Sequence, residues 1–247
     1  MIQQSFIFLE GIGNGKEKKL WKQGVSDWQK YLDFKANGVS SKTRIKHSLQ
    51  IKQAERSLKE YDYSFFHKNL AQNQHWRLFN QVKDNLVYLD IETSGYYGDI
   101  TVIGMYDGNQ TMTMVRGKNL DKELFNKTLA QYDGIVTFNG SSFDLPIIKK
   151  YFNTDFSNKV HIDLRHVCSK IGLVGGLKKI ERDVGIKRAD EVSDISGADA
   201  VYLWQQYRAT GNQKYLQLLV QYNEEDIVNL EPLAKKVISE LWKSLRS

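Results

Sequence analysis

Two acidic residues at the end of an apolar run have the type and spacing that metal-dependent chemistry requires. Asp90 and Glu92 lie two residues apart in LVYLDIE, a pattern that predicts a buried strand. Side chains two apart on a strand share one face, and burying two like charges there is costly unless they are neutralised. Hard divalent cations such as Mg²⁺ bind carboxylate oxygens. The pair therefore predicts a metal site.

Two later segments carry groups that fit the same site. Asp144 lies in FNGSSFDLP, after a predicted strand, and Tyr222 and Asp226 are four apart in YNEED, so they share one face of a helix. Each acid taken alone has a simpler interpretation. Asp144 could be stabilised by a helix dipole, and Asp226 could be a surface charge. Their occurrence together favours a shared site.

In chain order, these motifs resemble the three exonuclease motifs of the DEDDy class in the ribonuclease-H-like superfamily. The matching residues are Asp90-Ile91-Glu92, Asn139 to Asp144 followed by Leu145-Pro146, and Tyr222-x-x-x-Asp226. The segment GGLKKIERDVGI, from Gly175 to Ile186, is similar to the helix between the second and third motifs. The resemblance covers roughly residues 85 to 235. It is closest to the proofreading domains of family B DNA polymerases and, because no polymerase domain follows, to free-standing predicted ribonuclease-H-like exonucleases.

This resemblance implies phosphodiester hydrolysis with two divalent metal ions, Mg²⁺ or Mn²⁺. It implies that Asp90 bridges both ions and that Glu92 and Asp226 complete the site that activates water. Asp144 is implied to support the second ion. Tyr222 is implied to orient the water by a hydrogen bond. A free phenol has a pKa of about 10 and does not readily remove the proton of the water.

Two further residues are implied to support the site. Asn139 is expected to hold the loop that leads to Asp144. Asp163 ends the predicted strand KVHIDL and is expected to support the ligands from outside or to cap a helix.

Composition excludes several classes of protein. Hydrophobic residues make up 41% of the 247-residue chain, enough for a real core. One cysteine, Cys168, excludes an internal disulfide and a cysteine-rich zinc site. The chain has no leader-like start and no apolar run near membrane-spanning length. These features predict a cytoplasmic protein with no membrane partner, and the absence of a G-x-x-x-x-G-K-[ST] segment predicts no nucleotide cofactor.

Positive charge is concentrated before the first acidic motif. Residues 1–84 carry 15 Lys and Arg against eight Asp and Glu, whereas residues 85–247 carry 20 against 21. Basic residues surround apolar ones at helical spacing in the predicted helix 41–60. We therefore predict a basic helical nucleic-acid-binding domain over residues 1–84, with DNA as the first candidate partner and RNA as the second. A solvated helical surface is the alternative, and no protein partner is indicated.

The start of this basic segment resembles the second half of a helix-hairpin-helix motif. In such motifs, amides at a helix start bind a phosphate without reading sequence. The candidate nucleic-acid-binding residues are Gly11, Gly13, Lys16, Lys18, Lys19 and Lys22. Only about ten residues precede the glycines, which leaves little room for a full first helix. The alternative is a tight turn that packs Trp21 and Trp28 into a small helical core.

The order of predicted elements from residue 85 to 247 is typical of an α/β fold. We expect strands over 86–92, 100–107, 110–116, 134–139 and 159–164, helices over 119–131 and 142–152, and one long helix or a helix pair over 212–245. Asp-Gly and Gly-Asn steps between the first three strands favour antiparallel hairpins. With the resemblance, this order predicts a ribonuclease-H-like mixed five-stranded sheet flanked by helices, preceded by the small basic helical domain.

These features favour a metal-dependent 3′–5′ exonuclease that acts on DNA. An RNA-trimming exoribonuclease remains open, because the sequence does not show whether a 2′-hydroxyl is read. A catalytically inactive nucleic-acid-binding module is a further alternative. The complete set of acidic residues argues against it.

Overall fold

The computed structural model describes residues 1–34, 40–95 and 98–247. The strands are β1 (Leu86–Thr93), β2 (Ile100–Tyr106), β3 (Thr111–Val115), β4 (Gly134–Thr137) and β5 (Val160–Asp163). The α-helices before the sheet are α1 (Asn14–Lys22), α2 (Trp28–Asp33), α3 (Ser41–Lys59), α4 (Ser64–Asn69) and α5 (Phe79–Val82). Short 3₁₀ helices are η1 (Ile2–Gln4), η2 (Gln72–Leu78) and η3 (Lys83–Asn85). The later α-helices are α6 (Lys122–Ala130), α7 (Asp144–Phe152), α8 (Leu164–Lys170), α9 (Leu177–Val184), α10 (Asp190–Ser193), α11 (Gly197–Thr210) and α12 (Gln213–Arg246).

The strands form one mixed sheet in the order β3-β2-β1-β4-β5. β1 pairs antiparallel with β2 and parallel with β4, and β5 continues the parallel half. The predicted mixed five-stranded sheet is confirmed, and β1 is its central strand. Since the carboxyl ends of parallel strands meet at one edge, this order places the ends of β1, β4 and β5 side by side.

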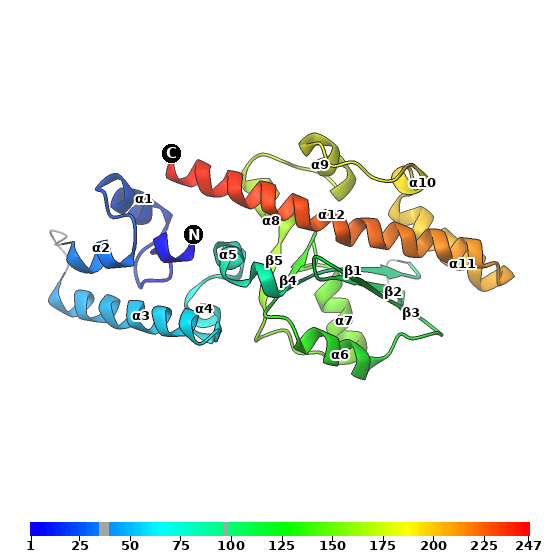
Figure 1. Cartoon of the computed structure of the whole chain (residues 1–247), viewed down its shortest axis with the longest axis horizontal. Helices are drawn as coiled ribbons and strands as arrows, with labels where there is room; N and C mark the ends of the chain where they lie inside the picture. Colours follow the sequence, from blue (N-terminus) through cyan, green and yellow to red (C-terminus); the bar gives the residue numbers. More distant parts are fainter. Residues whose placement is uncertain (35–39, 96–97) are drawn as a thin grey trace.

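Alternation along β1 assigns its side chains to two different layers. Val87, Leu89 and Ile91 lie in the core with α6 and α7. Leu86 and Tyr88 lie on the opposite face, in a core that includes apolar residues of α12. Asp90 and Glu92 continue that second row, because residues two apart share a face. In Figure 1, α6 and α7 cover one face of the sheet and α12 runs across the other.

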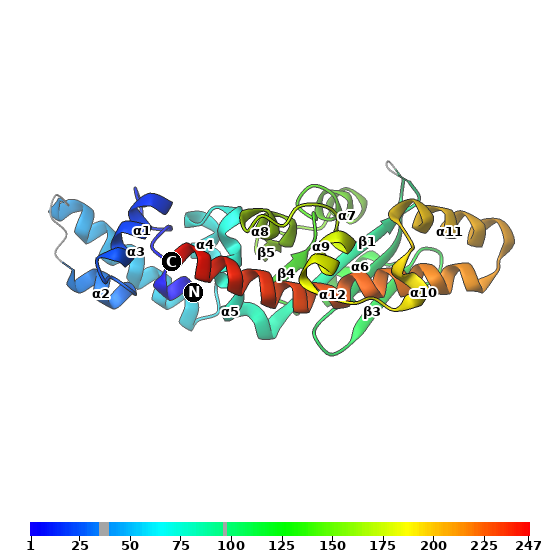
Figure 2. The ribbon, with the colours of Figure 1, turned by 90° about the horizontal axis from the view of Figure 1, so that it is seen from above.

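Helix α12 links the sheet to the N-terminal helices. The sequence left open a single helix or a helix pair here, and the structure has one helix that contains Pro232. Near its end, the Trp242 ring contacts the rings of Trp21 and Trp76, with centroids 5.5 and 6.2 Å away. Both views show the two termini side by side (Figures 1 and 2), and the Arg246 guanidinium donates to Gln4. The N-terminal helices and α12 therefore share one core.

An ion pair is buried inside the N-terminal helices. Glu17 on α1 and Arg77 on η2 are each 1% exposed, and their Oε2 and Nη2 atoms are 2.9 Å apart. Glu17 also accepts hydrogen bonds from the Ser5 hydroxyl and the Phe6 amide. The Arg77 guanidinium lies over the Trp76 ring, 4.9 Å from its centroid. Removing either charge would leave the other buried and unpaired, so the pair ties α1 to η2.

Among the residues described, no helix is both long enough and apolar enough to cross a membrane.

Candidate metal centre

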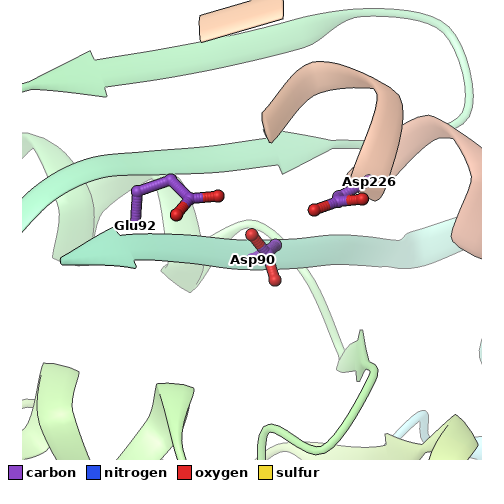
Figure 3. Close-up of side chains that lie close together, drawn as sticks. All are labelled: Asp90, Glu92 and Asp226. Atoms are coloured by element: carbon purple, nitrogen blue, oxygen red, sulfur yellow. The ribbon is translucent and has the colours of Figure 1, made fainter. Parts of the chain in front are cut away.

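Three carboxylates from β1 and α12 meet on the face of the sheet under α12. Asp90, Glu92 and Asp226 each offer an oxygen atom, and these atoms all lie within 4.8 Å of one another. Figure 3 shows Asp90 and Glu92 extending from the strand and Asp226 from the helix, with their carboxylates turned toward one another. Residues 136 positions apart in sequence thus supply one cluster, which is an arrangement that a hard divalent cation can bind.

Burial makes the charged forms of these groups unfavourable. It raises the pKa of Asp90 well above its usual range, and the charges of Asp144, Asp226 and Glu92 raise it further. Burial, followed by the charge of Asp226, likewise raises the pKa of Glu92 well above its usual range. Asp90 keeps some contact with solvent, although protein atoms surround it. Within the described residues, no salt bridge reaches Asp90 or Glu92. A bound cation would supply the missing charge, so the donor set fits a divalent metal.

Asp144 contacts β1 from α7, which covers the face of the sheet opposite α12. It is the first residue of α7, is 2% exposed, and its Oδ1 accepts a hydrogen bond of 3.1 Å from the Ile91 amide. Burial raises the pKa of Asp144 to about 7. Asp144 stands outside the group of three oxygens within 4.8 Å, yet its charge raises the pKa of Asp90. It therefore adjoins the cluster without being part of its closest set.

Asp163 holds the loop that leads to Asp144. Asp163 ends β5 and accepts hydrogen bonds from the Asn139 amide at 2.8 Å and the Ser141 amide at 3.0 Å. It also caps α8 through the Arg165 amide. Asn139 has a positive φ of 70°, and its side-chain oxygen accepts from the Arg165 guanidinium. Asp163 and Asn139 thus shape the approach to Asp144, and neither belongs to the metal-type group.

Asn223 on α12 orients Asp90 by a hydrogen bond. No pattern in the sequence predicts this role. The Asn223 side chain is 0% exposed, and its amide nitrogen donates to Asp90 Oδ2 at 2.9 Å. The space that Asn223 occupies exists because the residue opposite Asp90 on β2 is Gly104. A Cβ atom at Gly104 would lie 2.0 Å from Asn223 Oδ1. This glycine therefore admits the side chain that orients Asp90.

Replacing Gly104 by alanine should disturb the cluster through Asn223. The added methyl group overlaps Asn223, so we expect a loss of about 1–3 kcal/mol in the free energy of unfolding, as overpacked cores show. Binding of Mn²⁺ should weaken as well, because Asn223 can no longer hold Asp90. Urea denaturation and Mn²⁺ titration would measure both effects. Gly197→Ala is the matched control, since a Cβ atom there meets nothing within 4 Å. Equal stability and Mn²⁺ affinity for the two variants would contradict this role of Gly104.

Tyr222 and Asp226 lie one turn apart on α12, as their spacing predicts. Both are buried, at 8% and 6% exposure. Burial raises the pKa of the Tyr222 hydroxyl far above its usual value, and the neighbouring carboxylates raise it further, so the phenol stays protonated. Burial also raises the pKa of Asp226, whereas the Arg188 guanidinium and a hydrogen bond from Tyr222 lower it.

Arg188 is a further residue that the sequence did not indicate. It contacts Asp226 Oδ1 through Nη2 and is itself held by Glu181 of α9. Its Nη1 atom is buried and lacks a hydrogen-bond partner among the described residues. Glu181 lies in the segment that resembles the helix between the second and third motifs. The resemblance gave it no role.

The predicted phosphate-binding residues lie at the far end of the molecule from the sheet (Figure 1). Gly11 has a positive φ of 74°, and Gly13 immediately precedes α1, whose N-terminus has no side-chain cap. Before them the chain has only the three-residue η1, so a full first helix is absent from the described part. The four candidate lysines are all exposed: Lys16, Lys18, Lys19 and Lys22. Nearby, the indole N–H groups of Trp21 and Trp28 donate to the carbonyls of Gln4 and Ser5.

Comparison with known proteins bears on the sheet and α12. A sequence model of the RNase H superfamily matches residues 87–238, more than half of the chain. No curated protein matches significantly. The family B DNA polymerase from the hyperthermophilic archaeon Pyrobaculum calidifontis superposes with a TM-score of 0.51 and 15% identity, over 62% of this chain and 24% of the polymerase. Escherichia coli RNase D, an exoribonuclease involved in structured RNA processing, has a TM-score of 0.47 and 18% identity, over 70% of this chain and 44% of its own. The chain thus spans about a quarter of the polymerase, and the likeness to it concerns the fold.

Proposed function

The chain belongs to the RNase H superfamily, and we propose that it acts as a metal-dependent 3′–5′ exonuclease that hydrolyses phosphodiester bonds of DNA. The observation that carries this proposal is the convergence of Asp90, Glu92 and Asp226 within 4.8 Å. Their order along the chain, with Asp144 and Tyr222, is that of a DEDDy site. The basic N-terminal helices support a polyanionic substrate.

We propose two divalent ions, Mg²⁺ or Mn²⁺, as the cofactors. When bound, such ions polarise the phosphodiester and lower the pKa of the attacking water. Asp90, Glu92 and Asp226 would hold them, with Asp144 as a supporting ligand. Asp90 is suited to the shared position because it lies between the other two carboxylates in Figure 3. The four carboxylates carry the negative charge that two divalent cations would balance.

Tyr222 would orient the attacking water by a hydrogen bond. The raised pKa of its hydroxyl keeps the proton in place, and because that proton is donated to Asp226, the phenol oxygen would accept a hydrogen bond from the water and not act as the base. The Asp226 carboxylate, one helical turn away, fixes the direction of this hydroxyl. Asn139 and Asp163 would support the reaction by shaping the loop before Asp144, and Asn223 by orienting Asp90.

Digestion of end-labelled oligonucleotides tests this function. We expect single-nucleotide products released from the 3′ end of single-stranded DNA in Mg²⁺ or Mn²⁺, and no cleavage in EDTA. DNA and RNA, labelled at either end and offered as single and double strands, should be compared side by side. Faster trimming of RNA would reassign the substrate to the exoribonuclease alternative. Tight binding without cleavage in any metal would favour a binding module and overturn the enzyme proposal.

We propose that the exposed lysines of α1 bind the phosphate backbone. For single-stranded DNA, neutralising one phosphate fewer reduces the slope of log K against log salt concentration by about 0.7. The triple variant Lys18→Gln, Lys19→Gln, Lys22→Gln should therefore bind a DNA oligonucleotide more weakly, with a salt slope smaller by up to about 2. Fluorescence anisotropy across a salt series measures this slope.

The control carries the same loss of charge on another part of the molecule. Lys122 and Lys127 on α6 and Lys150 on α7 are also exposed. These two helices cover the face of the sheet opposite α12, away from α1 (Figure 1). Changing these three to Gln should leave the salt slope close to that of the native chain. If both triple variants lower the slope equally, DNA is attracted by the net charge of the molecule, and the proposed role of the α1 lysines is wrong.

A further inference from the structure

Arg188 lies beside the candidate metal centre in an unusual setting for a cation. Its side chain is 6% exposed, and it follows α9 in the segment before α10. Nη2 donates to Asp226 Oδ1 and, at 2.9 Å, to Glu181 Oε1. Nε donates to Glu181 Oε2 at 2.5 Å. One guanidinium therefore joins a carboxylate of the cluster to a second carboxylate outside it.

Glu181 removes the electrostatic penalty that Arg188 alone would impose. A lone buried guanidinium next to a metal ligand would repel an incoming cation, because charges interact strongly where water is excluded. Glu181 is 1% exposed and binds Arg188 through both carboxylate oxygens. The pair has no net charge. It can therefore donate a hydrogen bond to Asp226 without reducing the negative charge that attracts metal.

The pair is also expensive to bury, so it calls for a role other than stability. Taking two charges out of water costs several kcal/mol per ion, and apolar residues of similar volume often replace such pairs without loss of stability. Arg188 contacts Asp226 with one arm of a planar fork whose geometry the Glu181 carboxylate fixes. In metal sites, partners of this kind orient the ligands and tune the affinity for the ion.

The same part of the chain also fixes Tyr222. Lys178 on α9 lies over the Tyr222 ring, 5.1 Å from its centroid, and Arg188 lies 6.0 Å from it. Lys178 Nζ in turn donates to the carbonyls of Val192 and Ser193 at the end of α10. Two cations from the α9 region therefore contact Tyr222 and Asp226 on α12.

We propose that Arg188, held by Glu181, is a positioning residue for Asp226: it fixes one carboxylate oxygen so that the other is free to bind a divalent cation. Glu181 acts only through Arg188, by setting its direction and cancelling its charge. This inference rests on the proposed function for the assignment of Asp226 as a metal ligand.

Mn²⁺ binding to the full chain, measured by calorimetry, tests the proposal separately from activity. Removing a positive charge by Arg188→Gln should tighten Mn²⁺ binding if Arg188 acts only as a charge. If it orients Asp226, binding should instead weaken by about 10- to 100-fold. We expect weakening, and only partial recovery in Arg188→Lys, which keeps the charge and loses the fork. With single-stranded DNA, kcat should fall and KM should change little.

Glu181→Gln and the double variant complete the cycle. Glu181→Gln should weaken Mn²⁺ binding, because it leaves Arg188 loosely held and its charge uncompensated. Adding it to Arg188→Gln should have no further effect, since Glu181 acts through Arg188. The double variant also replaces the buried ion pair by two neutral side chains, so it avoids an unpaired buried charge. Arg182→Gln, an exposed arginine on the same helix, is the control and should match the native chain.

The outcomes separate this inference from the proposed function. Native Mn²⁺ affinity in Arg188→Gln, or tighter binding, would overturn the positioning role alone. Independent, additive losses in the double variant would also overturn it, because Glu181 would then act directly. If the native chain binds Mn²⁺ and the variants behave as expected but DNA is not cleaved, the nuclease proposal fails and the positioning role stands. If the native chain binds no Mn²⁺, both fail.

Discussion

Asp90→Asn is expected to abolish metal-dependent cleavage, with a fall in kcat of more than about 10³-fold. The substitution removes the charge at the centre of the cluster and keeps the shape of the side chain. Its remaining oxygen can still accept the hydrogen bond from Asn223. We therefore expect loss of Mn²⁺ binding without loss of the fold. Single-turnover cleavage and calorimetry measure the two effects.

The same substitution should stabilise the chain when no metal is present. The folded pKa values of the cluster lie above the unfolded ones, and that of Asp144 is raised from 3.8 to about 7. Folded chains therefore bind more protons than unfolded chains in this range, and stability falls as pH rises from about 4 to about 7. Asp90→Asn removes one of the repelling charges. Its melting temperature in EDTA at pH 8 should exceed that of the native chain by about 2–4 °C for each kcal/mol of relieved repulsion.

Glu224→Gln provides the matched control for Asp90→Asn. Glu224 lies on α12 near Asp226, but its carboxylate accepts a hydrogen bond from Thr113 on β3. It should retain cleavage, Mn²⁺ binding and the native response to pH in EDTA. Near-native cleavage by Asp90→Asn would remove the carboxylate cluster from the reaction.

Tyr222→Phe is expected to lower kcat by about 10²-fold, the lower end of the range for a positioned proton donor or acceptor. The change deletes one hydroxyl and keeps the ring that Lys178 and Arg188 contact. Because the raised pKa keeps the hydroxyl protonated, its loss should reduce the rate equally at every pH between 6 and about 9. The dependence of kcat on pH should therefore keep its shape, and KM and Mn²⁺ affinity should change little.

Tyr207→Phe is the control for Tyr222→Phe. Tyr207 is a partly buried tyrosine on α11 that packs against Trp204. A Tyr222→Phe enzyme that loses only one limb of the pH profile would show that the phenol transfers a proton. In that case Tyr222 would act as a base, and the proposal that it only orients the water would be wrong.

The fold was largely predictable, because its signals are local. The apolar run before Asp90 predicts the central strand, and period-two alternation places Asp90 and Glu92 on one face. The structure has that strand at Leu86–Thr93 and the predicted helix 41–60 at Ser41–Lys59. The four-residue spacing of Tyr222 and Asp226 likewise holds on α12. Element ends shifted by a few residues, as at α7, which begins at Asp144 and not near residue 142.

The supporting residues of the site were not predictable, because their partners are distant in sequence. Asn223 reaches Asp90 across 133 positions, and nothing in YNEED separates it from a surface residue. Gly104 has no local turn to explain it, and its role appears only when α12 lies across β2. Arg188 and Glu181 are single charges in a segment rich in charges. Tertiary packing, which brings these groups together, leaves no periodic pattern in the chain.

The length of α12 links the chemistry at its middle to the tryptophans at its end. Asp226 and Trp242 are 16 residues apart, or about 24 Å along a helix axis. The helix is continuous through this stretch, Pro232 included, and it packs against both the sheet and the N-terminal helices, so heat should disrupt both in a single cooperative transition. Four of the five indoles, Trp21, Trp28, Trp76 and Trp242, lie in or against the core that the N-terminal helices share with α12. Their intrinsic fluorescence during melting would then report cation binding at carboxylates that none of these indoles touches.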